Sequence, residues 1–129
     1  MITLSGPAID RITSAVLKGE RRRAHVLVTF LGLTRMRALN HEHLGHDRPT
    51  DVISFALPTP DGRLVGDIYI CRSVAATQAR THRVPVRQEL IRLVVHGTLH
   101  VLGYEHPEGG ARTRSPMWLR QERYVRKLA

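Results

Sequence analysis

The feature that most constrains the fold is a long apolar stretch between residues 86 and 102. Its apolar residues fall on nearly every side of a helix, at Leu90, Ile91, Leu93, Val94, Val95, Leu99, Val101 and Leu102. A surface helix keeps one broad polar face, whereas a helix that is apolar all round is normally buried. We therefore predict a central, buried helix from Val86 to Leu102, ended by Gly103 and covered by the rest of the chain.

Three histidines near the end of this helix form a candidate metal site. His96 and His100 are four residues apart, so they lie on one helical face, one turn above the other. Gly103 allows the backbone to leave the helix, and the chain can then return His106 to the same point. Three neutral imidazoles suit a catalytic zinc with one open position. We predict one Zn²⁺ ion held by His96, His100 and His106.

The alternative for any single histidine on an apolar helix is an ordinary hydrogen-bonded core residue. Two on one stripe and a third after a glycine turn favour a metal, because each unsatisfied buried polar group costs about 1–3 kcal/mol. The spacing matches the zinc-hydrolase pattern H-E-x-x-H-x-x-G-x-x-H, except that Gly97 replaces the glutamate that acts as general base. This indicates a zinc hydrolase that acts on bonds other than peptides, or one with a base from elsewhere.

The remaining pattern predicts helices and strands that alternate along the chain. Helices are expected at residues 8–17, 33–43, 73–81 and 117–128, and strands at 24–30, 51–57 and 64–71, the last two joined as a hairpin. Gly19 is expected to stop the first helix and Ser73 to cap the third. These elements indicate the α+β class, with a small mixed β-sheet packed with helices. The length of 129 residues fits one domain, residues 1–129.

The charge of the chain favours a polyanionic partner. Twenty Lys+Arg against 11 Asp+Glu give a formal net charge of +9, which attracts RNA, DNA, ribosomes or acidic lipid. Because only Lys18 and Lys127 are lysines, the bias of a GC-rich genome is the alternative. Such bias explains the ratio of arginine to lysine, but not the excess of basic over acidic residues. We therefore favour nucleic-acid contact.

The single cysteine and the pattern of apolar residues indicate the cellular compartment. Cys71, the single cysteine, follows an apolar run and is expected to be a small core residue. No basic segment leads into a long apolar run, and no stretch reaches the roughly 20 apolar residues of a membrane span. We expect a cytoplasmic protein. His41, His43 and His46 are interpreted as surface-loop residues, with extra metal ligands as the alternative.

The quoted residues together resemble the YbeY family of endoribonucleases. Residues 96–106 resemble that family's H-G-x-L-H-x-x-G-Y-D-H, with Glu105 at the aspartate position. Leu39-Asn40, residues 49–55 (P-T-D-V-I-S-F) and residues 66–71 (G-D-I-Y-I-C) match further family segments in the same order. The resemblance implies a zinc-dependent, single-strand-specific endoribonuclease. It would act in ribosomal RNA maturation and ribosome quality control, with ribosomal RNA and the small ribosomal subunit as partners and no DNA specificity.

The chain also departs from the family pattern. The family usually has an arginine that engages substrate phosphate just before the glycine of the upstream loop, where this chain has Leu44. Arg48 is a candidate to take that role, and Glu105 is a candidate to orient water or a ligand. Arg92 shares the helix stripe of the histidines, and an ion pair with Glu89 or Gln88 is its alternative role. The family's N-terminal strand is expected to be shortened to residues 2–4.

Two other functions remain open at this point. A non-catalytic ribosome- or RNA-binding factor with a structural zinc would explain the basic charge and the leucine in place of the family arginine. A zinc peptidase-like hydrolase would explain the ligand spacing, although the missing glutamate at Gly97 counts against it.

Overall fold

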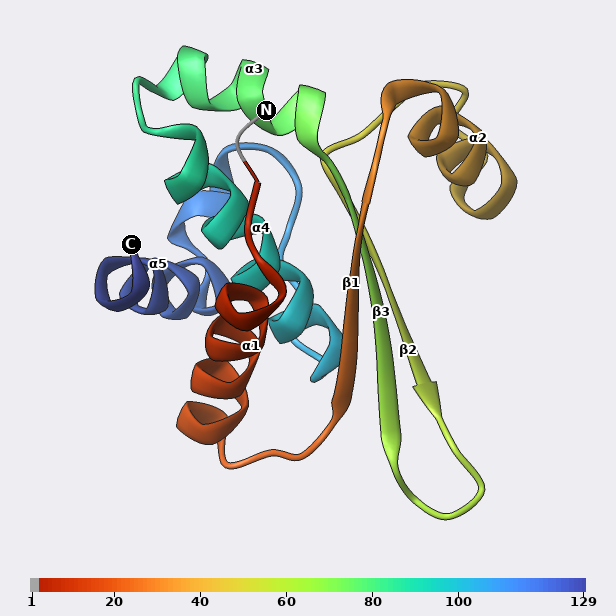
Figure 1. Ribbon diagram of the computed structural model, residues 1–129, viewed down its shortest axis with the longest axis vertical. Helices are drawn as coiled ribbons and strands as arrows, with labels where there is room; N and C mark the ends of the chain where they lie inside the picture. Colours follow the sequence, from red (N-terminus) through yellow and green to blue (C-terminus); the bar gives the residue numbers. More distant parts are fainter. Residues whose placement is uncertain (1–2) are drawn as a thin grey trace.

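The computed structural model describes residues 3–129 and shows helices and strands that alternate along the chain (Figure 1). In chain order the elements are α1 (Gly6–Glu20), β1 (His25–Leu31), α2 (Leu33–Leu44), β2 (Val52–Pro58), β3 (Leu64–Cys71), α3 (Arg72–His82), α4 (Val86–Val101), the 3₁₀ helix η1 (Gly109–Arg114) and α5 (Pro116–Leu128). The five predicted helices and the three predicted strands of the sheet are all present within these residues. The α+β class is therefore confirmed.

The sheet is small and mixed, as predicted, with its strands in the order β1-β3-β2. β1 runs parallel to β3, with His25 opposite Val65, whereas β2 runs antiparallel to β3, with Val52 opposite Ile70. β2 and β3 form the predicted hairpin. Side chains alternate between the two faces of the sheet, so one face packs on helix α4 and the other lies toward α2 (Figure 1).

Helix α4 is the centre of the molecule, packed against the sheet on one side and against α1, α3 and α5 elsewhere (Figure 1). Leu90, Ile91, Val94, Val95 and Leu99 are completely buried. Burial of a side chain of this size contributes about 1.5–3 kcal/mol, so α4 supplies much of the apolar core. The predicted buried helix is confirmed, and its end at Val101 lies one residue from the predicted one.

Two glycines allow α4 to approach the sheet closely. A Cβ at Gly97 would lie 2.8 Å from Cγ2 of Ile68, and a Cβ at Gly66 would lie 2.6 Å from the side chain of Val101. Both distances are too short for carbon atoms in contact, so any larger residue would push α4 away from β3. Gly97 therefore serves the packing of the helix that carries the histidines.

The predicted stop of the first helix at Gly19 is wrong. Helix α1 continues to Glu20, and Arg21 caps it in the left-handed conformation with φ 55°. Gly19 instead lies where Tyr124 of α5 packs against α1, leaving no room for a Cβ. A glycine needed for close packing between helices has the same appearance in sequence as a glycine that ends one.

Two further expectations fail at element boundaries. Helix α3 begins at Arg72, with Cys71 in the capping position and no side-chain cap, so Ser73 lies inside the helix. The strand expected at residues 2–4 is absent at Thr3 and Leu4, while Ile2 lies outside the described residues. The backbone leaves β3 directly into α3, which removes the turn that a serine cap would need.

A smaller apolar cluster lies between the sheet and α2, formed by Leu31, Met36, Ile53 and Cys71. Cys71 is fully buried, which confirms it as a core residue. Nearby, the Nδ2 of Asn40 donates a hydrogen bond of 2.8 Å to the carbonyl oxygen of Arg48. This bond fastens the loop between α2 and β2, which leads into one wall of the site described below.

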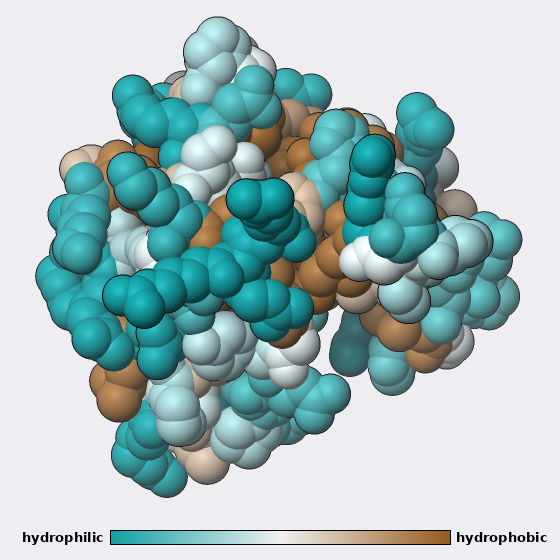
Figure 2. All heavy atoms as spheres, turned by 90° about the horizontal axis from the view of Figure 1, so that it is seen from below, coloured by the Kyte–Doolittle hydropathy of each residue, from teal (hydrophilic) through white to brown (hydrophobic). Residues whose placement is uncertain are grey.

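Hydrophilic side chains cover most of the face of the molecule shown in Figure 2. Among residues 3–129, no helix combines the length and the hydropathy that crossing a lipid bilayer requires.

Candidate metal centre

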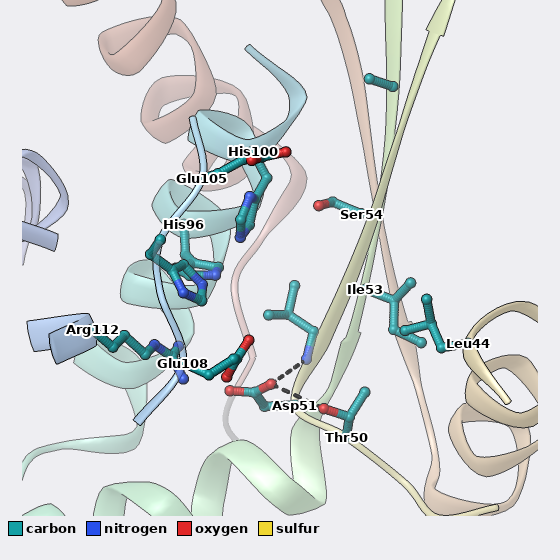
Figure 3. Close-up of a pocket in the computed structure, with 13 residues that line it drawn as sticks. Leu44, Thr50, Asp51, Ile53, Ser54, His96, His100, Glu105, Glu108 and Arg112 are labelled. Carbon is teal, nitrogen blue, oxygen red and sulfur yellow. Dashed lines mark hydrogen bonds between the residues drawn. The ribbon is translucent and has the colours of Figure 1, made fainter. Parts of the chain in front are cut away.

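The last two turns of α4 and the loop after it bring three histidines together (Figure 3). His96 and His100 lie one turn apart on α4, and Gly103, with φ 101°, turns the chain so that His106 returns to them. The ring centroids are 4.6, 5.1 and 5.2 Å apart, and one nitrogen of each ring lies within 4.8 Å of those of the others. The predicted convergence of the three residues is confirmed.

Each histidine places its Nδ1 against an oxygen atom of the chain. The Nδ1 of His96 lies 2.6 Å from Oε1 of Gln121, that of His100 lies 2.8 Å from the carbonyl oxygen of Tyr104, and that of His106 lies 3.1 Å from the carbonyl oxygen of Pro107. Because carbonyl oxygens accept, each Nδ1 must carry the proton in a neutral ring. The lone pair therefore resides on Nε2, which is the arrangement that a histidine metal ligand needs.

Burial keeps the central histidines neutral. Desolvation lowers the pKa of His96 to about 4, against an opposing hydrogen bond to Gln121. Burial also lowers the pKa of His100, and the positive charge of Arg112 acts in the same direction on both rings. At neutral pH both rings are consequently unprotonated and able to donate to a metal ion.

The Glu20 side chain supports the site from a distance. Its carboxylate accepts a hydrogen bond of 2.6 Å from the hydroxyl of Tyr104, the residue whose carbonyl oxygen faces His100. Tyr124 and Arg120 of α5 bind the same carboxylate. This network joins the end of α1 and the middle of α5 to the loop after α4, and so helps to fix the orientation of one imidazole.

The histidines open into a cleft of about 580 Å³ between two walls (Figure 3). The metal wall, from α4 and the segment after it, consists of His96, His100, Glu105, His106, Glu108 and Arg112. The strand wall, from the end of α2 and from β2 with the residues before it, consists of Leu44, Thr50, Asp51, Val52, Ile53, Ser54 and Ala56. A cleft of this size can hold a nucleotide-sized group beside the histidines.

Comparisons with known proteins identify the family that has this architecture. A family profile described as "Endoribonuclease YbeY" matches residues 6–129. The chain belongs to the YbeY family. A protein named Endoribonuclease YbeY from Thermotoga maritima is 34% identical over 113 residues, which cover 88% of this chain and 73% of the relative. Another, from Desulfitobacterium hafniense, is 41% identical over 117 residues, or 82% of this chain and 74% of the relative.

A third YbeY relative and a solved structure agree with this assignment. The Endoribonuclease YbeY of an Anaeromyxobacter species is 46% identical over 88 residues, or 67% of this chain, and the chain spans only 46% of that relative's length. The solution structure of TM1509 from Thermotoga maritima matches with a TM-score of 0.65 and 30% sequence identity, covering 98% of this chain and 85% of that chain. The YbeY resemblance stated from the motifs is thereby confirmed.

The two predicted catalytic residues occupy different places in this YbeY chain. Glu105 is exposed and lines the cleft beside His100. Arg48 is exposed in the loop between α2 and β2 and is not among the residues that line the cleft. Glu105 therefore lies at the histidine site, whereas Arg48 lies outside the cleft.

Arg92 has the structural role that was its alternative. It donates to Glu89 at 2.8 Å and, through two nitrogens, to Glu122 at 2.9 Å. These bonds occupy its guanidinium within the packing of α4 against α5. His41, His43 and His46 are all exposed and stand apart from the histidine cluster, although His41 and His43 lie in the last turn of α2 rather than in a loop.

Sequence reasoning missed three residues of the site: Glu108, Arg112 and Gln121. Gln121 had a detectable signal, because it lies four residues from both Met117 and Val125 on the buried stripe of α5. A polar residue on such a stripe needs a partner inside the protein. Glu108 and Arg112 gave no such signal in the sequence beyond their closeness to the third histidine, since their positions depend on the path of the loop.

Proposed function

We propose that this chain is a metal-dependent, single-strand-specific endoribonuclease that acts in ribosomal RNA maturation and ribosome quality control. The observation that carries this proposal is the histidine triad in an open cleft, with one ligand nitrogen of each ring within 4.8 Å of the others. Membership of a family named for endoribonuclease activity supplies the substrate class. The net charge of +9 supports a polyanionic substrate.

The donor set fits one zinc ion. Three neutral imidazole nitrogens with a fourth position facing a cleft are the ligands of a catalytic rather than a structural zinc. Three carboxylates line the same cleft against one guanidinium, so a dication would balance its charge. Iron, nickel and copper also accept imidazole ligands, and we propose zinc as the ion.

When bound, the metal supplies Lewis-acid chemistry by polarising water or a phosphoryl oxygen. Within the cleft, we assign Glu105 to orient the attacking water and to take up its proton, because its carboxylate lies beside His100 and is exposed. Asp51 is unsuited to this task, since its carboxylate already accepts hydrogen bonds from the Val52 amide and the side chains of Thr50 and Gln78. Its contacts join β2 to α3.

We keep Arg48 in a binding role outside the cleft. It is exposed at the entrance to β2, where a basic side chain can contact the RNA backbone. We also propose that residues 1–129 form one YbeY-like domain, that its partners are ribosomal RNA and the small ribosomal subunit, and that it works in the cytoplasm.

The peptidase alternative is disfavoured by packing as well as by sequence. A glutamate at position 97 would be driven into Ile68 of β3, because even a Cβ there lies 2.8 Å from that side chain. The position that carries the peptidase base in the related motif therefore cannot carry one here without moving α4.

The decisive experiment is cleavage of a single-stranded ribosomal RNA fragment by the zinc-loaded protein, beside His100→Ala. We expect the wild type to cleave the RNA. Loss of an outer partner of a metal ligand costs about 10- to 100-fold in activity, and loss of the ligand itself in His100→Ala should cost more. His41→Ala removes an exposed histidine of α2 and serves as the matched control, with unchanged cleavage and zinc content. A wild type that binds zinc and RNA but does not cleave would support the non-catalytic RNA-binding factor instead.

A further inference from the structure

Arg112 stands in an unusual position among the arginines of the chain. It lies in η1, half-buried, and its side chain lines the cleft beside His96 (Figure 3). Its positive charge is felt at the metal site, since it lowers the pKa of both His96 and His100. The guanidinium lies 5.7 Å from the ring centroid of Trp118, which supports it from α5.

The hydrogen-bonding capacity of Arg112 is unused. Its Nε is buried with no hydrogen-bond partner, and within residues 3–129 no carboxylate lies in ion-pair distance of the guanidinium. By contrast, Arg92 binds two glutamates and Arg120 binds Glu20. A buried donor without an acceptor costs free energy and calls for an explanation, of which an absent ligand is one.

The charge of the cleft points to the kind of ligand. Its lining contains the carboxylates of Asp51, Glu105 and Glu108, and Arg112 is its sole permanent cation among the described residues. An anionic strand that approaches the histidines meets these carboxylates and needs a positive group at the same depth. Arginine is suited to the task, because its planar fork binds two phosphate oxygens at once and is less strongly hydrated than an ammonium group.

We propose that Arg112 is the phosphate-binding residue of the cleft, donating from its guanidinium to a phosphate of the RNA strand that reaches the histidine triad. The identity of the strand as RNA rests on the proposed function, whereas the binding of a phosphate does not. Trp118 holds the guanidinium in place before the ligand arrives, which reduces the conformational entropy lost on binding. This role belongs to the segment after α4 and not to the loop that contains Leu44 and Arg48.

The test compares Arg112→Met with Arg114→Met. Methionine keeps an unbranched chain on Trp118 and removes the charge, and Arg114 is an exposed arginine of the same 3₁₀ helix. Binding of a short labelled single-stranded RNA is measured by fluorescence anisotropy in EDTA, over a range of salt concentrations, so that neither metal nor cleavage contributes. We expect Arg112→Met to weaken binding roughly tenfold and to reduce the salt slope by about 0.7, the value for one lost phosphate contact on a single strand.

Arg112→Lys keeps the charge and loses the fork. It should retain the salt slope and bind with intermediate affinity. With zinc present, Arg112→Met should cleave roughly 100-fold more slowly than the wild type, as when one group that stabilises transition-state charge is removed. Its melting temperature should be no lower than that of Arg114→Met, because the substitution removes a buried donor that has no acceptor.

Two results would overturn the proposal. One is equal affinity and salt slope for Arg112→Met and Arg114→Met. The other is a loss of binding in Arg112→Lys as large as in Arg112→Met, with a lowered melting temperature in both, which would make the residue a packing element on Trp118. If the wild type binds this RNA but does not cleave it, the proposed endonuclease function fails, and the binding comparison still decides the role of Arg112.

Discussion

The two walls of the cleft differ in how much chemistry they carry. The metal wall holds three imidazoles, two exposed carboxylates and a guanidinium, whereas the strand wall presents apolar and hydroxyl side chains and one carboxylate, that of Asp51. Leu44, at the end of α2, is 53% exposed on the strand wall. A charged residue at this position would therefore remain in contact with solvent. The ligand-binding groups are thus gathered in one continuous segment, from the last turns of α4 to η1.

The strand wall therefore sets the shape of the cleft, whereas the metal wall carries the groups that bind ligands. β2 is held rigidly by its pairing with β3 and by Asp51, which joins it to α3. The metal wall is held by outer contacts of its own: Gln121 to His96, and the Glu20 network to the loop beside His100. Substitutions should therefore change chemistry on one wall and only shape on the other.

The largest expected effect is a loss of stability of the metal-free protein in acid, caused by His96 of the metal wall. Unfolded His96 has an ordinary pKa of 6.5, and burial lowers its pKa to about 4 in the folded chain. Between these values the unfolded state binds a proton that the folded state refuses, so the free energy of unfolding decreases as pH falls from 6.5 to 4. The metal-free protein should lose about 3 kcal/mol over this range. Urea unfolding at several pH values measures it.

His96→Asn provides the matched control for this loss. The folded-state pKa values of Glu20, Asp47, Asp61 and Glu122 are lowered, so these carboxylates act mainly at lower pH. His100, whose pKa is also lowered, should leave a smaller residual slope in the variant. A variant with the same pH dependence as the wild type would show that another group is responsible.

The next effect is the loss of an outer contact of the metal wall. Gln121→Leu removes the oxygen that lies 2.6 Å from Nδ1 of His96 while preserving a side chain of similar size on the buried stripe of α5. Loss of such a partner typically lowers metal affinity about 10- to 100-fold, because the tautomer and the ring orientation are no longer fixed. Competition with a zinc chelator measures this affinity. Ser54→Ala on the strand wall should leave it unchanged, and equal losses in both variants would contradict the division between the walls.

Much of the metal wall could be predicted from sequence because its determinants are local. The spacing of His96 and His100 on one helix and the glycine before His106 depend only on helical geometry, and the structure brings the three rings together as expected. The strands could be predicted equally well, since the alternation of apolar and polar side chains defines them without reference to distant residues.

The residues that were missed depend on tertiary packing. Gln121 reaches His96 only because α5 packs against α4, and Arg112 enters the cleft only because η1 folds back onto Trp118. Gly19 and Gly97 show the same limit from the other side. Their local patterns indicate a helix stop at Gly19 and a missing catalytic base at Gly97, but they do not show that each glycine allows two elements to approach closely.

The smallest expected effect comes from moving the positive charge from the metal wall to the strand wall. Leu44 lines the cleft opposite Arg112, so Leu44→Arg in the Arg112→Met background returns one guanidinium to the cleft from the strand wall. Because phosphate binding needs charge, the salt slope of RNA binding should return fully to the wild-type value. Cleavage should recover only about tenfold of the loss, since a flexible side chain without the support of Trp118 holds the phosphate less well in place.

Leu44→Met in the same background controls for the change in shape. If Leu44→Arg restores neither binding nor cleavage, a cation on the strand wall cannot reach the phosphate, and the two walls are not interchangeable even for charge. If it restores cleavage completely, the position of Arg112 on Trp118 contributes nothing beyond its charge. An intermediate value would separate the two contributions, because the salt slope reports the charge alone while the cleavage rate also reports how well the phosphate is positioned beside the histidines.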